Sequence, residues 1–308
     1  MSPLITLLFV LLLITFVKCD PSLFCDFSEP INDEDFDGKI IKKRDAICSN
    51  YDVLFDQVLY KIDYYNDLIH NDIDYEGVLF DQATRFTGIK LIKITNLIIN
   101  QSKFKLTNPS KPGTHKHLFL PDPRALNIIK LNDVTMNLEG YQQFADLMQS
   151  MQNVYHVELT NCKLISETND VMDLNWITKL KTWFSSSTTI ITIDDCSVNK
   201  IDDGSFSNAI ENLRMFSLAK NKLKQFNRLW LSKNSDTKNP EPLNHLWYLD
   251  LSGNQIDKIN QFDLINMPKL KVVKLNNNQL TSLGNFPQLF SEVWKNLKEF
   301  YISGNQIL

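Results

Sequence analysis

The chain has 308 residues, of which 43% are hydrophobic, and this content excludes a disordered protein because it is enough to build a sizeable core. Its 32 basic and 36 acidic residues give a net charge of −4, which provides no bulk attraction to nucleic acid. Only 9 residues are glycine, which argues against collagen and flexible linkers. Asparagine is in excess, with 31 residues, and this excess needs a structural reason.

The N-terminus begins with an uncharged apolar run, LITLLFVLLLITFV, at residues 4–17. The run is shorter than the roughly 20 residues of a membrane-spanning helix, and the small residue Cys19 offers a cleavage point before Asp20. We therefore predict that residues 1–19 are a signal peptide and that the protein is secreted, with an uncleaved N-terminal anchor as the alternative. No later segment approaches 18 consecutive apolar residues, so we expect no membrane span in the mature chain.

The segment that follows is strongly acidic. Residues 20–81 contain 16 acidic and 5 basic residues, a net charge of −11. Such a segment is typically a solvated face, and we predict an acidic N-terminal cap over residues 20–88. Without the signal peptide four cysteines remain, an even number that suits an oxidising compartment and allows three pairings. They are Cys25, Cys48, Cys162 and Cys196.

An eleven-residue pattern, LxxLxLxxNxL, then recurs along the rest of the chain. A clear copy holds Leu246, Leu249, Leu251, Asn254 and Ile256. Eight copies start at residues 89, 126, 154, 188, 213, 246, 270 and 297, and positions four, six and eleven are apolar in every copy. Because alternate residues of a strand point to opposite faces, positions four and six bury inward while positions three, five and seven face outward. Repeats of this kind stack into a solenoid.

The pattern resembles that of the extracellular leucine-rich-repeat family. The resemblance implies an α/β solenoid, a horseshoe with a concave parallel β-sheet and irregular or helical convex segments, over residues 89–308 and without a C-terminal cap. The helical apolar spacing at 137–151 and 172–184 fits such convex segments, and the proline-rich stretch 108–124 predicts a projecting loop. The chain is also similar to arthropod secreted repeat proteins related to the non-catalytic subunit of oplophorus-luciferin 2-monooxygenase.

Position nine explains part of the asparagine excess. A buried carboxamide can donate and accept, so it can satisfy the backbone of its own turn and of the neighbouring copy. We predict a structural ladder of Asn221, Asn254, Asn278 and Asn305. The earlier copies have Leu97 and Val134 at this position, which cannot form these bonds, and we expect looser turns there.

The cysteines fall in two pairs. Cys162 and Cys196 hold position nine in consecutive copies, about one strand spacing of 5 Å apart, so a disulfide or two buried thiols can form there. The family resemblance favours the reduced thiols. The same resemblance, to the cysteine-stapled cap of extracellular repeat proteins, implies a disulfide between Cys25 and Cys48. Asn100, in Asn-Gln-Ser, is the one glycosylation acceptor sequence.

The sequence contains no nucleophile elbow, phosphate loop or metalloprotease helix. His115 and His117 lack a third metal ligand at a suitable spacing, and the acid pairs at 194–195 and 202–203 are typical of solvated turns. We therefore predict a non-enzymatic protein with no cofactor and no metal.

Positions three and five form two outward rows, the first mostly apolar, and an apolar row on a sheet surface predicts a protein-binding face. The alternative is that position three lies at the strand entry and is partly covered by long return segments. The predicted face consists of Leu91, Lys93, Ile128, Lys130, His156, Glu158, Ile190, Thr192, Met215, Ser217, Tyr248, Asp250, Val272 and Lys274.

We expect a secreted repeat module whose partner is an extracellular or cell-surface protein and not a nucleic acid. One alternative is the truncated ectodomain of a membrane receptor of the Toll-like or adhesion type, because the last copy stops one residue past its final template position. A second alternative is the non-catalytic subunit of a secreted enzyme complex.

Overall fold

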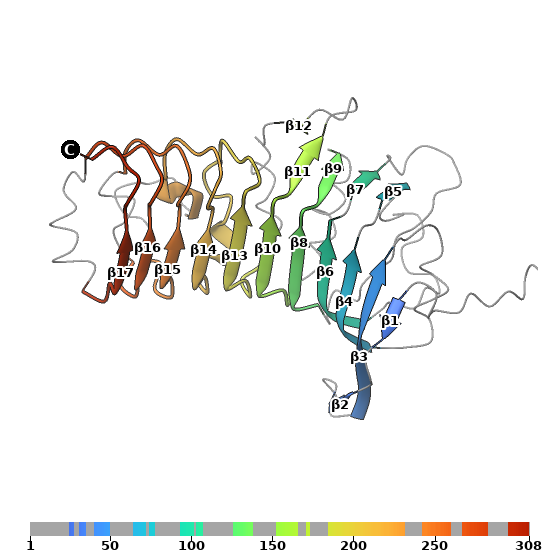
Figure 1. Cartoon of the computed structure of the whole chain (residues 1–308). Coiled ribbons are helices and arrows are strands. Elements are labelled where there is room, and N and C mark those ends of the chain that lie inside the picture. The colour runs from blue at the N-terminus through green and yellow to red at the C-terminus, as the bar shows by residue number, and fades with distance from the viewer. Residues whose placement is uncertain are drawn as a thin grey trace, which may run out of the picture.

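The chain folds into a solenoid of mostly parallel strands, shown in the computed structural model of Figure 1. The structure describes residues 25–27, 31–34, 40–49, 64–71, 74–77, 93–101, 103–106, 126–137, 152–165, 171–172, 184–231, 242–259, 267–282 and 295–307. The predicted signal peptide (1–19), the proline-rich loop with His115 and His117, and nearly all of the two predicted helical segments lie outside these residues.

A 12-stranded sheet runs along the molecule, and all its strands pair in parallel except β1 and β2, which pair antiparallel with β3. Its order is β1 (Cys25–Phe27), β3 (Ile40–Ser49), β4 (Tyr64–Asn71), β6 (Lys93–Asn100), β8 (Ile128–Asn132), β10 (His156–Thr160), β13 (Ile190–Asp194), β14 (Met215–Ser217), β15 (Tyr248–Asp250), β16 (Val272–Lys274) and β17 (Glu299–Tyr301), with β2 (Ile31–Glu34) beside β3.

A second sheet of five short strands follows the first one at the N-terminal half (Figure 1). Its order is β12 (Val171–Met172), β11 (Lys163–Ile165), β9 (Thr135–Asn137), β7 (Lys103–Leu106) and β5 (Asp74–Gly77). The helices of the described residues are two 3₁₀ turns, η4 (Ser207–Ala209) and η5 (Arg228–Leu231). The α/β class with helical convex segments is therefore not confirmed, and the described residues form a β solenoid.

The core lies where the repeat pattern predicts it. In β8, β10 and β13 burial alternates from residue to residue, so that positions four and six point inward. Leu249 in β15 and Leu251 directly after that strand are fully buried. Aromatic side chains fill the middle of the array, where the ring centroids of Phe206 and Phe216 are 4.9 Å apart in an edge-on arrangement. The core is therefore one continuous stack, to which each copy adds a layer.

Each copy turns after its strand through a residue with positive φ at position eight. These residues are Gln101, Asp133, Asn161, Asp195, Lys220, Gly253, Asn277 and Gly304. The backbone N–H groups of the first seven donate to the position-seven carbonyl of the next copy, for example from Gly253 to Asn276 at 2.9 Å and from Asn277 to Ser303 at 2.8 Å. The left-handed conformation aims these donors along the solenoid, which explains why glycine, asparagine and aspartate are frequent there.

Position nine completes the turn. Asn221 accepts from the backbone N–H groups of Cys196 and Val198, both at 3.0 Å, and donates to the carbonyl of Ile193 at 2.7 Å. Asn254, Asn278 and Asn305 repeat this arrangement, each accepting from the preceding copy and donating to it. One asparagine side chain thus joins two copies, and four of the 31 asparagines have this structural role.

The first copy has a different register from the predicted one. Leu97 pairs with Ile129 and Ile99 pairs with Leu131, so these two buried residues hold positions four and six. The copy therefore starts at residue 94 and not at 89, and Leu97 does not occupy position nine. The predicted register was wrong because residues 89–99 are so rich in Ile and Leu that two alignments satisfy the pattern. Only pairing with the next strand separates them.

The boundary between cap and repeats also differs from the prediction. Strands β3 and β4, which lie within the predicted cap at residues 20–88, are parallel members of the same sheet. Ile69 pairs with Ile47 on one side and with Ile98 on the other. The sheet therefore continues into the acidic segment, and only β1 and β2 run antiparallel to it.

Candidate binding surface

The outward side chains of the long sheet form a surface that we call the open face. It carries positions three, five and seven, and the strand pairing places equivalent positions side by side. Row three, from β8 to β17, consists of Ile128, His156, Ile190, Met215, Tyr248, Val272 and Glu299, and row five consists of Lys130, Glu158, Thr192, Ser217, Asp250, Lys274 and Tyr301.

The exposure of row three falls between core and free surface. Its members from Ile128 to Tyr248 are all half-buried, while Val272 is 9% exposed and Glu299 is exposed. The side chains from Ile128 to Tyr248 are therefore neither core nor freely exposed. A half-buried apolar row on rigid strands is already ordered, so a partner would bind it with little loss of side-chain entropy.

The register of strand β6 changes which residues belong to the predicted surface. Its residues Asn96 and Ile98 pair with Ile128 and Lys130, so they occupy rows three and five. Lys93 pairs with Tyr64 at the start of the strand and is outside these rows. Leu91 lies outside the described residues. These two residues were misplaced by the same register error that moved the first copy.

Charged side chains on β8 and β10 neutralise one another. Lys130 Nζ lies 2.9 Å from Glu158 Oε2, and His156 Nε2 lies 3.5 Å from the same oxygen. The hydrogen bond from His156, together with Lys130, lowers the pKa of Glu158 to about 2 even though partial burial opposes the shift. Glu158 therefore stays ionised and holds its neighbours in place at ordinary pH.

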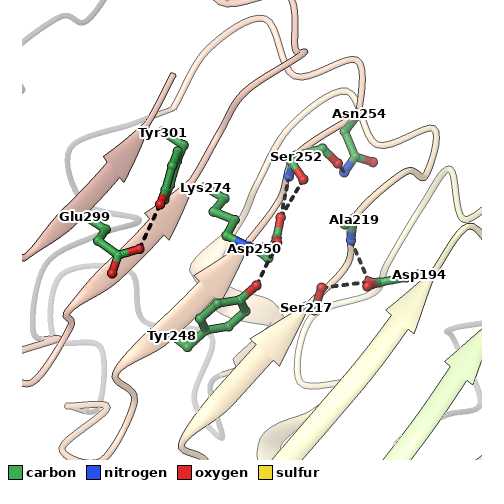
Figure 2. A network of polar contacts seen from close by, with 10 residues as sticks. All are labelled: Asp194, Ser217, Ala219, Tyr248, Asp250, Ser252, Asn254, Lys274, Glu299 and Tyr301. Atoms are coloured by element: carbon green, nitrogen blue, oxygen red, sulfur yellow. Dashed lines mark hydrogen bonds and ion pairs between the residues drawn. The ribbon is translucent and has the colours of Figure 1, made fainter. Parts of the chain in front are cut away.

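Asp194 is the polar residue that the sequence analysis placed wrongly. It was assigned to a solvated turn, but it lies at the end of β13 at position seven and is half-buried. Figure 2 shows its carboxylate between Ser217, whose hydroxyl donates at 2.7 Å, and the backbone N–H of Ala219 at 2.8 Å. Burial raises its pKa to about 6, and the negative charges of Asp250 and Glu158 add to the shift.

Asp250 is the centre of a second cluster on the open face (Figure 2). It is 7% exposed and accepts from the Tyr248 hydroxyl at 2.9 Å, from the Ser252 hydroxyl at 2.6 Å and from the Ser252 N–H at 3.0 Å. Lys274 Nζ lies 3.4 Å from Asp250 and 5.1 Å from the centre of the Tyr248 ring. The hydrogen bond with Tyr248 raises the pKa of Lys274, so its charge is retained.

The two buried cysteines are free thiols that repeat the asparagine ladder in weaker form. The Cys162 N–H donates to Cys196 Sγ at 3.4 Å, and the Cys162 thiol donates to the Leu131 carbonyl at 3.2 Å. Burial raises the pKa of Cys196 well above its usual value, so this thiol is unreactive. Of the two alternatives for this pair, the structure contains the reduced one.

The remaining predicted sites are placed by their backbone alone. Cys25 of β1 lies directly opposite Cys48 of β3 in the antiparallel ladder. Asn100 is the last residue of β6 and precedes the exposed position-eight residue Gln101. Among the described residues, no three His, Cys, Asp or Glu side chains lie close enough together to hold a metal ion. Those residues also include no helix with the length and hydrophobicity needed to cross a membrane.

Comparison with known proteins gives structural neighbours only. No family model and no curated protein matches the chain. FLRT2, the leucine-rich-repeat component of a complex with latrophilin 3 and Unc5D, is 17% identical over 80% of this chain and 70% of the matched chain, with a TM-score of 0.49. An internalin from Listeria monocytogenes is 16% identical over 88% and 85%, with a TM-score of 0.37.

The Drosophila Toll–Spatzle complex is 14% identical over 91% of this chain and 47% of the matched chain, with a TM-score of 0.27. The chain thus spans about half the length of that neighbour. Overlaps of this size do not decide the architecture. The parallel-strand solenoid is established by the strand register and the turn hydrogen bonds of the chain itself.

Proposed function

We propose that the protein is a secreted, non-catalytic repeat module that binds another extracellular or cell-surface protein through its open face. The observation that carries the proposal is the unbroken row three, whose half-buried side chains lie side by side from β8 to β15. Beside it, the charges of row five are already paired within the chain. A face with an apolar strip and satisfied polar neighbours is suited to a protein partner.

The chemistry of this face supports binding rather than catalysis. Its buried carboxylates, Asp194 and Asp250, are each hydrogen-bonded by neighbouring residues of the chain. The two free cysteines are buried under the turns and away from the open face. Export is proposed on the apolar run at residues 4–17 and on the acceptor sequence at Asn100.

The test uses the chain from Asp20 onward as bait in extracellular fluid, followed by identification of the bound proteins. The variant Ile190→Glu with Met215→Glu places two charges in the centre of row three, where β13 and β14 pair. We expect it to lose at least about 90% of the partner that the unchanged chain recovers, because a buried unpaired charge at an interface centre costs several kcal/mol.

A matched control adds the same two charges elsewhere. Thr281→Glu with Ser282→Glu modifies exposed residues that follow position eleven of their copy and lie off the open face. This control should recover the partner normally. Loss of recovery by both variants, or a fall in thermal unfolding temperature of the Ile190 and Met215 variant by more than roughly 8 °C, would show that row three is core and would refute the proposal.

A further inference from the structure

A separate row of residues lies just before the strands, at position two. The backbone N–H of Trp247 donates to Arg214 at 3.0 Å, that of Lys271 to Trp247 at 2.8 Å, and that of Lys298 to Lys271 at 2.8 Å. These bonds place the four residues side by side, at the roughly 4.8 Å spacing of neighbouring strands. They follow the edge of the sheet at which the arrows of β14 to β17 begin in Figure 1.

Several exposed cations gather at this edge. Two more lysines lie in the turns that lead to the same strands, and we call the set of five the basic rim. It consists of Arg214, Lys269, Lys271, Lys295 and Lys298, all of them exposed. Within the described part of the chain none of them forms an ion pair. The neighbouring carboxylate of Glu299 already accepts from the Tyr301 hydroxyl at 2.9 Å.

The rim is confined to one half of the solenoid. In the N-terminal copies the same row holds Asn127, Tyr155 and Thr189, which carry no charge and follow the same backbone ladder. Like charges on adjacent strands repel one another, so Lys271 beside Lys298 disfavours the folded state slightly. A rigid row of repelling cations becomes favourable when an anionic chain lies along it.

An aromatic ring within this row narrows the ligand class. Trp247 is half-buried, and its ring meets that of Tyr248 edge-on with a centroid distance of 5.9 Å, which fixes its orientation. A flat ring among regularly spaced cations can stack on a sugar ring whose substituents are anionic. Grooves for single-stranded nucleic acid instead offer an aromatic ring to successive bases, and the part of this row that leads into β14 to β17 holds one ring, Trp247, among the described residues.

We propose that the basic rim binds a linear sulfated polysaccharide. The sulfate groups contact the five cations, and one sugar ring stacks on Trp247. The rim is distinct from the open face. The proposal rests on only one part of the proposed function, the export of the protein, which would bring it to such a ligand. Variants in the two surfaces therefore separate the two proposals.

The test measures binding of a fluorescein-labelled heparin oligosaccharide to the full mature chain by fluorescence anisotropy, across a range of salt concentrations. The triple variant Lys269→Gln, Lys271→Gln and Lys298→Gln should bind at least about 10-fold more weakly and show a smaller salt dependence. Trp247→Leu should weaken binding by roughly 3-fold or more, because the ring is lost. Ile190→Gln with Met215→Gln, which adds no charge next to Arg214, should leave heparin binding unchanged.

The matched control is Lys163→Gln, Lys224→Gln and Lys258→Gln, which removes three exposed lysines away from the rim and makes the same change in net charge. It should bind heparin within about 2-fold of the unchanged chain. Equal loss in the control, or equal binding of chemically desulfated heparin, overturns the proposal. So does stronger competition by polyuridine RNA or by polyglutamate, or a rim-dependent self-association seen by light scattering at low salt.

Discussion

At the scale of single residues, Asp194 shows how the strand register creates an unusual carboxyl group. Its two hydrogen bonds, from Ser217 and from the N–H of Ala219, stabilise the charged form, but burial outweighs them and raises the pKa to about 6. Because the ordinary aspartate value is 3.8, folding binds a proton between these two values. The charged form is therefore a destabilising element at neutral pH.

The consequence is a testable pH dependence. Below about pH 4 the carboxyl group is protonated in the folded and the unfolded state, so it does not change the stability. Above about pH 6 it is ionised in both states, and the cost of the buried charge destabilises the folded state in full. The free energy of unfolding therefore falls as the pH rises from about 4 to about 6. Asp194→Asn keeps an oxygen that can accept both hydrogen bonds. It should be more stable than the unchanged chain by about 1–2 kcal/mol at pH 7.5, with no difference at pH 4.

The measurement is urea denaturation at several pH values. Asp195→Asn serves as the control because Asp195 is exposed in the adjacent turn. This variant keeps Asp194, so its stability should follow the pH dependence of the unchanged chain. A destabilised Asp194→Asn protein at pH 7.5 would mean that the carboxylate charge itself supports the fold, contrary to the burial argument.

At the scale of elements, the eleven-residue pattern predicts the strands and the buried positions well. It does not predict features that depend on pairing with a neighbouring copy, such as the register of the first copy. Positions four and six were predicted correctly in β8 to β16 because a strand with one buried face alternates, and Leu249 and Leu251 are examples. The first copy was misaligned because consecutive Ile and Leu residues satisfy two registers. Strand β4 was missed because its position equivalent to Ile99 is the polar residue His70.

The open face was predicted only in part for the same reason. Rows three and five follow from the period of two along a strand, but which polar groups are buried depends on the partner across the sheet. Asp194 could be assigned to a turn from sequence, since aspartate is common in turns, and only the neighbouring Ser217 and Ala219 show that it is held on the sheet. The overlooked signal is the combination of a carboxylate at position seven, Asp194, with a serine at position five of the next copy, Ser217.

The turns make a second prediction at this scale. Gly253 has φ +68°, and an added Cβ would lie 3.3 Å from the Cα and Cγ of Lys220 in the preceding copy. Gly253→Ala should lower the free energy of unfolding by about 1–2 kcal/mol, because alanine is strained in this conformation and the contact is tight. Lys220 has φ +55°, so Lys220→Gly should raise it by roughly 0.5–1 kcal/mol.

Both variants change the same template position in adjacent copies, so each is the control of the other. Chemical denaturation measures the two free energies in one buffer. Destabilisation by both would mean that side-chain packing at position eight, and not backbone strain, decides its composition.

At the scale of the whole molecule, the solenoid is a linear array in which each strand pairs only with its neighbours. Stability at one end is then a local property, and β1 is the edge strand of the N-terminal end. Its three residues pair with β3 and place Cys25 opposite Cys48. Directly opposed residues in an antiparallel pair have Cα atoms about 4.5–5.5 Å apart, within the range that a disulfide spans.

We therefore expect a disulfide between Cys25 and Cys48 that holds β1 on the sheet. Its loop is somewhat longer than 15 residues, so the bond should contribute roughly 3–4 kcal/mol to the N-terminal end. Cys25→Ser with Cys48→Ser should speed hydrogen exchange in β1, β3 and β4 and leave exchange in β14 to β17 unchanged, because the ends of a linear array are only weakly coupled.

Mass spectrometry of the alkylated, unreduced chain provides the direct check, with two thiols protected and the buried Cys162 and Cys196 alkylated only after unfolding. A reducing agent should reproduce the exchange pattern of the double variant in the unchanged chain and have no effect on the variant itself. Four alkylated thiols without reduction would rule out the bond. Faster exchange that extends to β17 would instead show that the array unfolds as one unit, which would contradict the additive core described by the repeat.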